Sequence, residues 1–488
     1  MARGRSAPRF SKNGPERPER AIMEYSVRQI CEITGGRLLM GDPDILLHHV
    51  TFDSRAMLGD DLFVPVPGEK VDGHRFIGGA FASGAAASLT AREDAVPAGE
   101  ALPEGRAVIL VDDTFEALQT IGRVRRAQEL KMPLVGVTGS VGKTTTREMT
   151  AAALSAGGRV TASVRNMNSQ LGVPVTLCHM DETADFAVAE MGISMPGEMD
   201  RLVSMVRPDV ALVTNIGVAH IENLGSREGI CREKMKITDF LPENGAAVLN
   251  GDEPLLREFA KDKPFRTVFY GLGPDCAVTA KDIDLGETAS FTAVFAPSLY
   301  GTEKEVFVQL TVPGEHHVMD ALAALSAAAV LGIAPEDAAA ELASFGGFAR
   351  RWERIPLGGL LLIDDSYNAN PVSMKASLAS FARVAAGRRI AVIADMLELG
   401  PDGPAMHREV GEFAAVLPVD LFITVGTAME EADRALSEAG KTVLHAADAK
   451  EAARILLEIA ADGDAVLLKG SNSMHLDMVR KALSEEMR

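Results

Sequence analysis

The sequence predicts an α/β protein built from three domains. Its 488 residues are too many for one ordinary hydrophobic core, so we expect about two to four domains. In two long stretches, apolar strand-like runs alternate with helix-like segments, which is typical of parallel sheets covered by helices. A region of shorter, mixed elements precedes them. We place the domains at residues 23–131, 132–347 and 348–488, after a tail formed by residues 1–22.

The tail and the first domain are distinguished by their composition. Residues 1–22 are rich in Arg, Pro and Gly and lack the apolar segment of a secretion signal, so we expect a disordered tail. From Tyr25 to Leu130, short mixed elements are separated by clusters of Gly, Pro and Asp such as GDPD and VPGEKVDGH. This pattern predicts a small α/β domain.

The second and third domains show the clearest strand–helix alternation. The second opens with the apolar run PLVGVT, and further strands follow at FAVAE, VALVTN and AAVLN. Between Phe265 and Val312 the pattern becomes β-rich and predicts an antiparallel patch, which precedes the alanine-rich helix HVMDALAALSAAAVLG. In the third domain, LLLID, RIAVIAD, LFITVG, TVLHA and AVLLKG each precede a helix-like stretch. We therefore predict a doubly wound parallel sheet in each of these domains.

Charge and cysteine usage narrow the classes of function. The formal net charge is −19, from 49 Lys plus Arg against 68 Asp plus Glu, which argues against a nucleic acid or an anionic membrane as a partner. No apolar run reaches the roughly 18 residues that span a bilayer, so we expect no membrane insertion. The four cysteines lie far apart and form no CxxC pair, which fits a reducing compartment such as the cytoplasm.

The segment from Gly136 to Thr146, GVTGSVGKTTT, is the strongest local signal. A glycine loop between a strand and a helix aims backbone N–H groups at phosphate oxygens, and the helix dipole favours their negative charge. Lys143 can reach the β- and γ-phosphates of ATP, and the hydroxyl of Thr144 can bind Mg²⁺. Val137 stands where the strict motif has glycine, so the loop is a variant. The predicted nucleotide-binding residues of the loop are Gly139, Ser140, Val141, Gly142, Lys143, Thr144 and Thr145.

Two further residues follow strands of the same sheet. Glu190 ends the strand FAVAE, so its carboxylate projects at the edge where nucleotides bind in parallel sheets, and Mg²⁺ requires such hard oxygen ligands. From position alone, an ordinary strand-end acid is an equally good interpretation. His220 follows the strand VALVTN, where an ordinary loop histidine is the simpler interpretation.

Taken together, these motifs resemble the Mur ligases, the ATP-dependent enzymes that form amide bonds in peptidoglycan precursors. The resemblance extends from Met23 to the C-terminus. It implies a small α/β UDP-binding domain, a central P-loop-type ATPase domain with a parallel sheet, and a C-terminal Rossmann-like domain. It also implies ATP and Mg²⁺ as cofactors, with UDP-N-acetylmuramoyl-tripeptide and D-alanyl-D-alanine as substrates. We expect a cytoplasmic monomer.

The first domain carries the implied contacts to the uridine nucleotide. DSRAMLGDDLFVPVPGEKVDGHRFI is similar to the segment with which the family binds UDP. The implied contacts are Ser54, Arg55, Asp72 and His74. Asp-Gly pairs are also common in ordinary turns, which is the alternative interpretation of this segment. Further along, NMNSQLGVPVTL resembles a substrate-side loop and adds Asn168, although the family often has Asn where Ser169 stands here.

Three segments of the second domain resemble the family's catalytic and metal site. AEMGISMPGEM carries Glu190, NIGVAHIENLGS carries His220, and SREGICREKMKI carries Lys234 at the place of a modified lysine. An ammonium group offers no acceptor to a cation, whereas carbamylation by CO₂ would turn Lys234 into a carboxylate-like group. The implied catalytic set is Lys143, Glu190, His220 and Lys234. The implied metal ligands are Thr144, Glu190, His220 and carbamylated Lys234.

The third domain points to one branch of the family. RRWERI and LLLIDDSYNANPVSM resemble segments in which Arg351 and Asp365 contact ATP, and in which Asn368 and Asn370 lie near the incoming dipeptide. ADMLELG stands where the branch that adds diaminopimelate or lysine carries a DNPR-like motif. This contrast favours D-alanyl-D-alanine as the acceptor.

One segment departs from the family pattern. PGEHHVMDALAA usually carries asparagine at the positions of His317 and Asp320. Those asparagines lie on the nucleotide side, so we expect adenine recognition to differ in detail.

The implied reaction activates the carboxylate of the tripeptide as an acyl phosphate, which the dipeptide amine then attacks. Another amide ligase of the superfamily, such as a folylpolyglutamate synthase or the Mur ligase that adds the third residue, remains an alternative. A nucleotide switch is an alternative from a different class. The sequence lacks the Asn-Lys-x-Asp element with which a GTPase reads guanine, and a switch has little need of Glu190, His220 and Lys234 around one metal.

Overall fold

The computed structural model describes residues 23–68, 71–95, 105–164, 166–345, 347 and 349–486. The tail expected at residues 1–22 lies outside these ranges. Contacts divide the chain into two compact units. The first unit contains the described residues up to Met132 together with Ser163–Thr183, and the second contains Pro133–Ala162 together with the described residues from Ala184 onward.

The first unit is built on a five-stranded sheet. Its elements are β1 (Tyr25–Ser26), α1 (Val27–Thr34), β2 (Arg37–Met40), β3 (Leu46–Leu47), β4 (His49–Thr51), β5 (Asp61–Phe63), the short 3₁₀ turn η1 (Gly73–Phe76), α2 (Ile77–Ala82), β6 (Ala87–Thr90), β7 (Ala107–Leu110), α3 (Thr114–Gln128) and α5 (Gly172–His179). The order is β2-β7-β6-β5-β4, with β2 antiparallel to β7 and the other pairs parallel, while β1 pairs with β3 alone. The predicted small α/β domain is confirmed.

Helix α5 belongs to the first unit, although the boundaries drawn from the sequence placed it with the second domain. Its side chains Val175 and Cys178 lie in the hydrophobic core that the strands and α1 of this unit share. The backbone of Gly122 on α3 approaches Pro174 so closely that a Cβ would lie 2.8 Å from the proline. The apolar sequence GVPVTLCH predicts burial, but a sequence pattern does not say against which core a helix packs.

The second unit begins with a nine-stranded sheet. Its elements are β8 (Leu134–Thr138), α4 (Lys143–Ser155), β9 (Val160–Ala162), β10 (Phe186–Glu190), α6 (Glu198–Val206), β11 (Val210–Val213), α7 (Ile221–Leu224), α8 (Arg227–Met235), β12 (Ala246–Asn250), α9 (Pro254–Ala260), β13 (Arg266–Tyr270), β14 (Val278–Leu285), β15 (Ala289–Phe295), α10 (Pro297–Tyr300), β16 (Lys304–Gln309), α11 (Glu315–Val330) and α12 (Pro335–Leu342). The order is β16-β15-β14-β13-β12-β11-β8-β10-β9. The pairs from β9 to β14 are parallel, and β14, β15 and β16 are antiparallel, as the change of pattern after Phe265 predicted.

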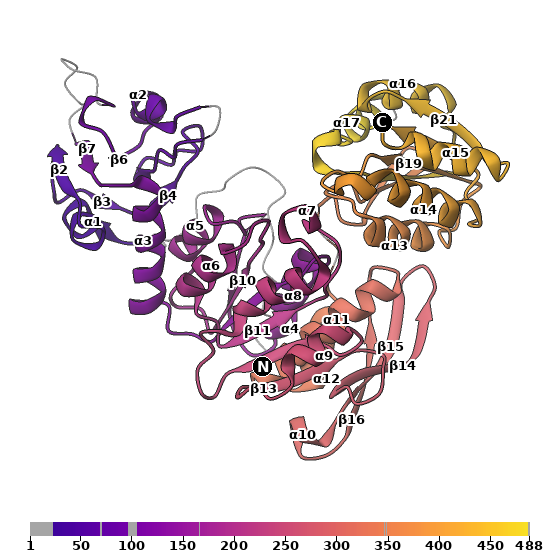
Figure 1. The fold of residues 1–488 in the computed structure, drawn as a ribbon, viewed down its shortest axis with the longest axis horizontal. Helices are drawn as coiled ribbons and strands as arrows, with labels where there is room; N and C mark the ends of the chain where they lie inside the picture. The colour runs from indigo at the N-terminus through magenta and orange to yellow at the C-terminus, as the bar shows by residue number, and fades with distance from the viewer. Residues whose placement is uncertain are drawn as a thin grey trace, which may run out of the picture. The chain divides into compact units, whose positions relative to one another are not determined.

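The same unit continues with a six-stranded sheet. Its elements are β17 (Glu353–Leu357), β18 (Leu360–Asp364), α13 (Pro371–Phe381), β19 (Arg388–Ala394), α14 (Gly403–Ala415), β20 (Leu421–Val425), α15 (Glu430–Glu438), β21 (Thr442–Ala446), α16 (Ala449–Ile459), β22 (Asp464–Lys469) and α17 (Asp477–Glu486). The order is β17-β18-β22-β19-β20-β21, and only β17 is antiparallel to its neighbour. Helices α13 and α14 cover one face and α16 and α17 the other (Figure 1), which confirms the doubly wound sheet.

Burial follows the sequence pattern in both sheets of the second unit. All five residues of β8, LVGVT, are buried, as expected for a central parallel strand that is covered on both faces. Helix α11 packs against α4, and the alanines of α11 allow this close approach. None of the helices in the described ranges combines the length and the apolar character that crossing a bilayer requires.

Candidate active site

The glycine loop connects β8 to α4 at the middle of the nine-stranded sheet. Gly142 precedes the helix with a φ of 81°, a left-handed conformation that favours glycine. No side chain caps the first turn of α4, so its leading N–H groups face outward as an anion site requires. Gly139 has a φ of 150°, and a Cβ there would overlap the hydroxyl of Thr214. Glycine is therefore required at both positions.

Lys143, the first residue of α4, folds back over the loop. Its ammonium group donates hydrogen bonds to the carbonyls of Gly139 (2.9 Å) and Ser140 (3.3 Å). Burial lowers the pKa of Lys143; Glu190 opposes this effect and Arg351 adds to it. A phosphate oxygen in place of the carbonyls would stabilise the charged form of this lysine.

Two residues that the sequence reading did not single out hold the loop in place. The side-chain oxygen of Asn215 accepts from the N–H of Val141 (3.0 Å), and its backbone carbonyl accepts from the N–H of Ser140 (3.1 Å). The hydroxyl of Thr214 donates to the carbonyl of Val141 (2.6 Å). Because these N–H groups of Ser140 and Val141 are already engaged, their predicted contacts to the nucleotide stay predictions. The only signal in the sequence was the position of Asn215 in the NIGVAH segment.

Glu190 and Thr144 form the oxygen pair of the site. The Thr144 hydroxyl donates to Glu190 Oε2 (2.9 Å), and Glu190 is 1% exposed at the end of β10. A nitrogen of the Arg147 guanidinium lies 3.6 Å from the same carboxylate oxygen. A guanidinium nitrogen of Arg351 donates to the Thr144 hydroxyl (2.9 Å). The pair is thus buried, oriented and in contact with cationic groups, as an ordinary strand-end acid would not be.

Lys234 and His220 lie within the electrostatic field of the loop. Lys234, on α8, is 1% exposed, and burial together with the charge of Lys143 lowers the pKa of Lys234 well below its usual value. His220 adopts a left-handed φ of 61°, and its Nδ1 lies 3.0 Å from Glu398. Burial lowers the pKa of His220; Glu398 opposes this, and Lys143 and Lys234 reinforce it. The charge of Glu190 in turn raises the pKa of Lys143. The four predicted catalytic residues therefore share one electrostatic neighbourhood.

Arg351 reaches the phosphate loop from the connection that precedes β17. Besides its bond to Thr144, its guanidinium stacks on the ring of Tyr367, with 4.2 Å between the guanidinium carbon and the ring centroid. The Nε of Arg351 is buried and has no hydrogen-bond partner within the described residues. An oxygen atom of a bound ligand would satisfy this donor.

The residues on either side of Arg351 have strained backbones. Arg350 and Trp352 have φ values of 61° and 56°, which cost of order 1 kcal/mol each in residues other than glycine. The Arg350 guanidinium donates to the carbonyl of Ser366 (2.7 Å) and to Asn472 Oδ1 (3.0 Å). The N–H of Trp352 donates to Asp365 Oδ1 (3.3 Å). These bonds offset the strain and fix the direction of Arg351.

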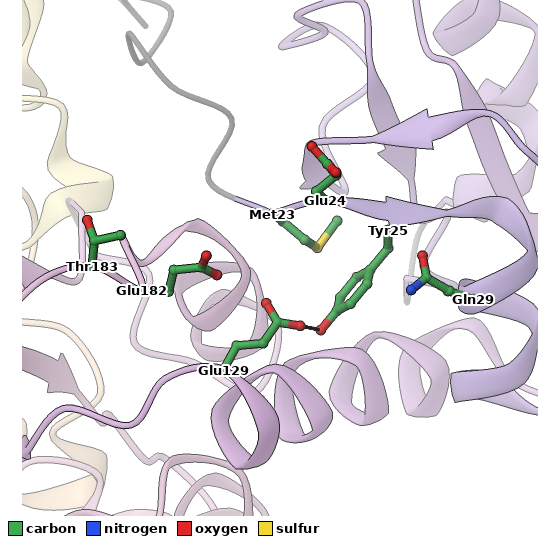
Figure 2. A pocket seen from close by; sticks show the side chains of 7 residues that line it. All are labelled: Met23, Glu24, Tyr25, Gln29, Glu129, Glu182 and Thr183. Carbon is green, nitrogen blue, oxygen red and sulfur yellow. Dashed lines mark hydrogen bonds between the residues drawn. The ribbon is translucent and has the colours of Figure 1, made fainter.

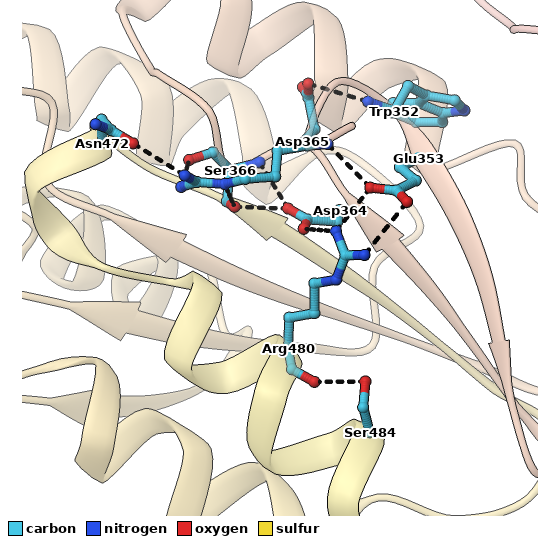
Figure 3. A network of polar contacts seen from close by, with 9 residues as sticks. Trp352, Glu353, Asp364, Asp365, Ser366, Asn472, Arg480 and Ser484 are labelled. Carbon is cyan, nitrogen blue, oxygen red and sulfur yellow. Dashed lines mark hydrogen bonds and ion pairs between the residues drawn. The ribbon is translucent and has the colours of Figure 1, made fainter. Parts of the chain in front are cut away.

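An ion-pair cluster holds this segment to the end of the chain. Arg480 on α17 contacts Glu353 (2.7 Å) and Asp364 (3.1 Å), as Figure 3 shows. Glu353 also accepts from the N–H of Arg350 (3.1 Å). The last helix is therefore connected through side chains to the segment that carries Arg351.

The remaining residues predicted in the third domain make internal contacts. Asp365 accepts from the ammonium of Lys469 (2.7 Å) and from the hydroxyl of Ser377. Asn368 accepts from the following N–H (2.9 Å). Asn370 is the N-cap of α13 and accepts from the N–H of Ser373 (2.9 Å). These contacts position the loop, and direct binding of ATP or dipeptide by these side chains stays a prediction.

The substrate contacts predicted in the first unit lie in two turns. Ser54 and Arg55 follow β4, and the exposed guanidinium of Arg55 pairs with Asp53 (2.8 Å). Asn168 lies ahead of α5, where its N–H donates to the carbonyl of Asn166 (2.8 Å). The exposed guanidinium of Arg55 is thus accessible to a ligand. The substrate contact of Asn168 stays a prediction.

Asp72 and His74 have structural partners. Asp72 caps η1 through the N–H of His74 (3.0 Å) and forms an ion pair with Arg92 (3.1 Å). His74 is 3% exposed; its Nδ1 faces Asp72 (2.7 Å), and its Nε2 accepts from the N–H of Ala91 (3.0 Å). Since both ring nitrogens are occupied, the geometry favours a role of His74 in holding the turn.

A cavity of about 670 Å³ in the first unit is a separate feature (Figure 2). Its lining residues are Met23, Glu24, Tyr25, Gln29, Glu129, Glu182 and Thr183. The Tyr25 hydroxyl donates to Glu129, and burial raises the pKa of Tyr25. The three glutamates make the cavity unsuitable for a diphosphate, and none of the predicted uridine contacts lines it.

These observations define a nucleotide-binding protein with a loop of P-loop type. At its end, Thr144 contacts Glu190 from a neighbouring strand and Arg351 from the segment ahead of β17. Family models match the chain at residues 46–126 (Mur ligase family, catalytic domain), 137–328 (Mur ligase middle domain) and 350–472 (Mur ligase, glutamate ligase domain). A UDP-N-acetylmuramoyl-tripeptide–D-alanyl-D-alanine ligase of Bacillus subtilis (strain 168) is 37% identical over 95% of this chain and 99% of its own length. The chain belongs to the Mur ligase family.

Solved structures support the same assignment. A crystal structure of MurF from Acinetobacter baumannii is 29% identical, with a TM-score of 0.84 over 96% of this chain and 100% of that one. MurF ligase from Thermotoga maritima in complex with ADP is 28% identical, with a TM-score of 0.74 over 90% of this chain and 97% of that one.

Proposed function

We propose that this chain joins D-alanyl-D-alanine to UDP-N-acetylmuramoyl-tripeptide, with ATP converted to ADP and phosphate. The observation that carries the proposal is the contact of Arg351 with Thr144 at the phosphate loop. It brings the first segment of the third domain to the residue that a nucleotide would meet. The curated relative and the ADP complex described above have names that state this activity and this product nucleotide.

The first step forms an acyl phosphate. A carboxylate oxygen of the tripeptide attacks the γ-phosphorus of ATP, the bond to the β,γ-bridging oxygen breaks, and ADP leaves with that electron pair. Lys143 and the first N–H groups of α4 bind the phosphates, and Arg351 donates to the oxygens on which charge develops. Such pre-oriented donors stabilise the transition state more than the ground state.

The second step forms the amide bond. The amine of D-alanyl-D-alanine attacks the acyl carbon, the carbon–oxygen bond to phosphate breaks, and phosphate leaves with that electron pair. The amine nitrogen releases one proton as the amide forms. Tyr367 and the loop that follows β18 lie on the Arg351 side of the site. We assign the dipeptide to that loop through Asn368 and Asn370. We assign the UDP part to the two turns of the first unit through Ser54, Arg55 and Asp72, with Asn168 on the substrate side. The contact predicted for His74 becomes a role in holding the turn of Asp72.

The residues present fit a magnesium ion. Thr144 Oγ1 and Glu190 Oε2 are 2.9 Å apart, and a hydroxyl with a carboxylate is the kind of oxygen pair that holds Mg²⁺ beside nucleotide phosphates. The described residues contain no cluster of three or more His, Cys, Asp and Glu side chains arranged for a metal. Thr144 and Glu190 would hold the ion, and the ion would supply neutralisation of phosphate charge. His220 and Lys234 are proposed to complete the site.

Lys234 is proposed to act as a carbamate. Carbamate formation requires a neutral amine, and burial lowers the pKa of Lys234 toward that form. The product carries oxygens that can accept hydrogen bonds or orient a cation, which an ammonium cannot.

We further propose that the protein works as a cytoplasmic monomer. Cys31, Cys178, Cys231 and Cys276 are all free thiols, which fits a reducing compartment. Light scattering of the purified chain is expected to give a mass near 51.8 kDa. A mass of twice that value would contradict the monomer and indicate a dimer.

An acceptor panel tests the proposed reaction. ADP release is measured with UDP-N-acetylmuramoyl-tripeptide and with D-alanyl-D-alanine, D-alanine, L-lysine, diaminopimelate or L-glutamate as the acceptor. We expect stimulation by the dipeptide alone. Two further substrates test the alternatives. Stimulation by lysine or diaminopimelate when UDP-N-acetylmuramoyl-dipeptide replaces the tripeptide would indicate the branch that adds the third residue. Stimulation by glutamate when a folate replaces it would indicate a folylpolyglutamate synthase.

A further inference from the structure

Asp320 is a buried carboxyl group at the phosphate loop to which the reaction described above gives no role. It lies on α11 and is 8% exposed. Its Oδ1 accepts a hydrogen bond from the hydroxyl of Thr146 (2.8 Å) on α4. The same oxygen lies 2.7 Å from the point that a Cβ of Gly142 would occupy. The carboxyl group therefore contacts the turn that opens α4.

The groups around Asp320 supply little positive charge. Arg351 is its cationic neighbour, but the guanidinium donates to Thr144 and forms no ion pair with Asp320 in the described part of the chain. On the adjacent β13, Tyr270 is buried, and the charge of Asp320 contributes to the raised pKa of Tyr270. On α11 itself, His317 lies one turn earlier with Nδ1 directed at the carbonyl of Pro313 (2.5 Å).

This environment favours the neutral carboxylic acid. Burial raises the pKa of Asp320 to about 7, against smaller lowering effects of Thr146 and Arg351. The neutral and ionised forms are therefore close in free energy near neutral pH. An ionised carboxylate beside a triphosphate is repulsive, and in a partly buried site this repulsion is not screened by water.

We propose that Asp320 makes nucleotide binding depend on protonation: the neutral acid admits the phosphates of ATP and ADP to the loop, and the carboxylate opposes them. This inference rests on the proposed nucleotide site, and it adds a determinant of nucleotide affinity on α11. An amide side chain cannot ionise, so a chain with asparagine there lacks this dependence.

Calorimetry tests the inference. It measures the affinity for ADP of the full-length chain and of Asp320→Asn from pH 6 to pH 8. If only the neutral form binds well, the ratio of the wild-type Kd to the variant Kd rises about tenfold over this range. Taking the ratio removes the titration of ADP itself and of Lys143, because both proteins share them. Asp252→Asn, at an exposed aspartate of the same unit, is the matched control and should show no change in this ratio.

Thr146→Val provides a second variant that keeps the carboxyl group. The Thr146 hydroxyl lowers the pKa of Asp320, so its loss should move the decline in ADP affinity to higher pH. A constant ratio of the wild-type Kd to the Asp320→Asn Kd across the pH range would overturn the inference. Weaker binding by Asp320→Asn at every pH would also overturn it, because the carboxylate would then accept a hydrogen bond from the nucleotide. ADP binding does not involve the acceptor, so failure of the ligase assignment appears separately in the acceptor panel.

Thermal unfolding without nucleotide gives an independent measurement. The pKa of Asp320 in the folded chain, about 7, exceeds the ordinary value of 3.8, so the folded state holds a proton that the unfolded state releases between these values. The wild type should therefore lose stability relative to Asp320→Asn as the pH rises from about 4 to about 7. A pH-independent difference in melting temperature would contradict a neutral buried acid.

Discussion

The phosphate loop of the second unit and the DSRAML segment of the first were both assigned to ligands from motifs, but their side chains lie in opposite environments. Thr144 and Glu190 are buried and share a hydrogen bond, and the half-buried Lys143 donates to carbonyls of the loop. Arg55 is exposed, and within the described residues its ion pair is with Asp53 alone.

The difference follows from what each region has to do. Transferring a phosphoryl group requires charges that are held in place and shielded from water, because a low local dielectric strengthens each interaction. Holding the distant uridine end requires only contact, so a surface turn is sufficient. A motif whose side chains are buried and bonded to neighbouring elements therefore supports a catalytic role. A motif in an exposed turn supports a binding role only. The variants below separate these two cases.

Lys143→Ala should have the largest effect. Loss of the ammonium that binds the phosphates is expected to lower kcat/KM for ADP release on the order of 10³-fold. Steady-state kinetics measure this, with Lys131→Ala, at an exposed lysine of the first unit, as the control. Near-normal kinetics in Lys143→Ala would mean that the loop does not bind the transferred phosphate.

Asn215→Ala should weaken ATP binding less severely. It removes the acceptor of the Val141 N–H and leaves the loop without its brace, so KM for ATP should rise roughly 10- to 100-fold. Asn223→Ala, at an exposed asparagine eight positions later, provides the control. Equal KM values for the two variants would show that the loop holds its conformation unaided.

His74→Ala should act on stability. Both ring nitrogens are bonded in a buried position, so the free energy of unfolding should fall by about 2 kcal/mol in denaturant titrations. Arg75→Ala, at the exposed neighbour, should leave stability nearly unchanged. If His74→Ala instead raises KM for the UDP-linked substrate at unchanged stability, the histidine contacts the ligand directly.

Arg55→Ala should have the smallest effect. We expect KM for the UDP-linked substrate to rise by a few-fold and the melting temperature to stay constant, because the guanidinium is exposed and surface ion pairs contribute little. Arg28→Ala, which breaks a similar exposed pair with Asp44, is the control. Identical KM values for both variants would remove Arg55 from the substrate site.

Particular residues show how far sequence reasoning extends. The GKTT core and the strand FAVAE predicted that Thr144 and Glu190 lie at one sheet edge, because strand ends of a parallel sheet converge there. Nothing local predicted that Asn215 would bond the loop, since that contact depends on β11 lying next to β8. The close contact of Asp320 with Thr146 likewise depends on how α11 packs against α4.

The sequence by itself determined the order of strands and helices, the phosphate loop and the family, because these follow from local periodicity and from short contiguous motifs. Only the tertiary structure decided that α5 packs in the first unit, that His74 holds a turn, and that Asp320 and Arg351 meet the loop. These are contacts between residues far apart in the chain, and their energies depend on distance, burial and neighbouring charge. None of those three quantities is encoded in a local pattern of residues.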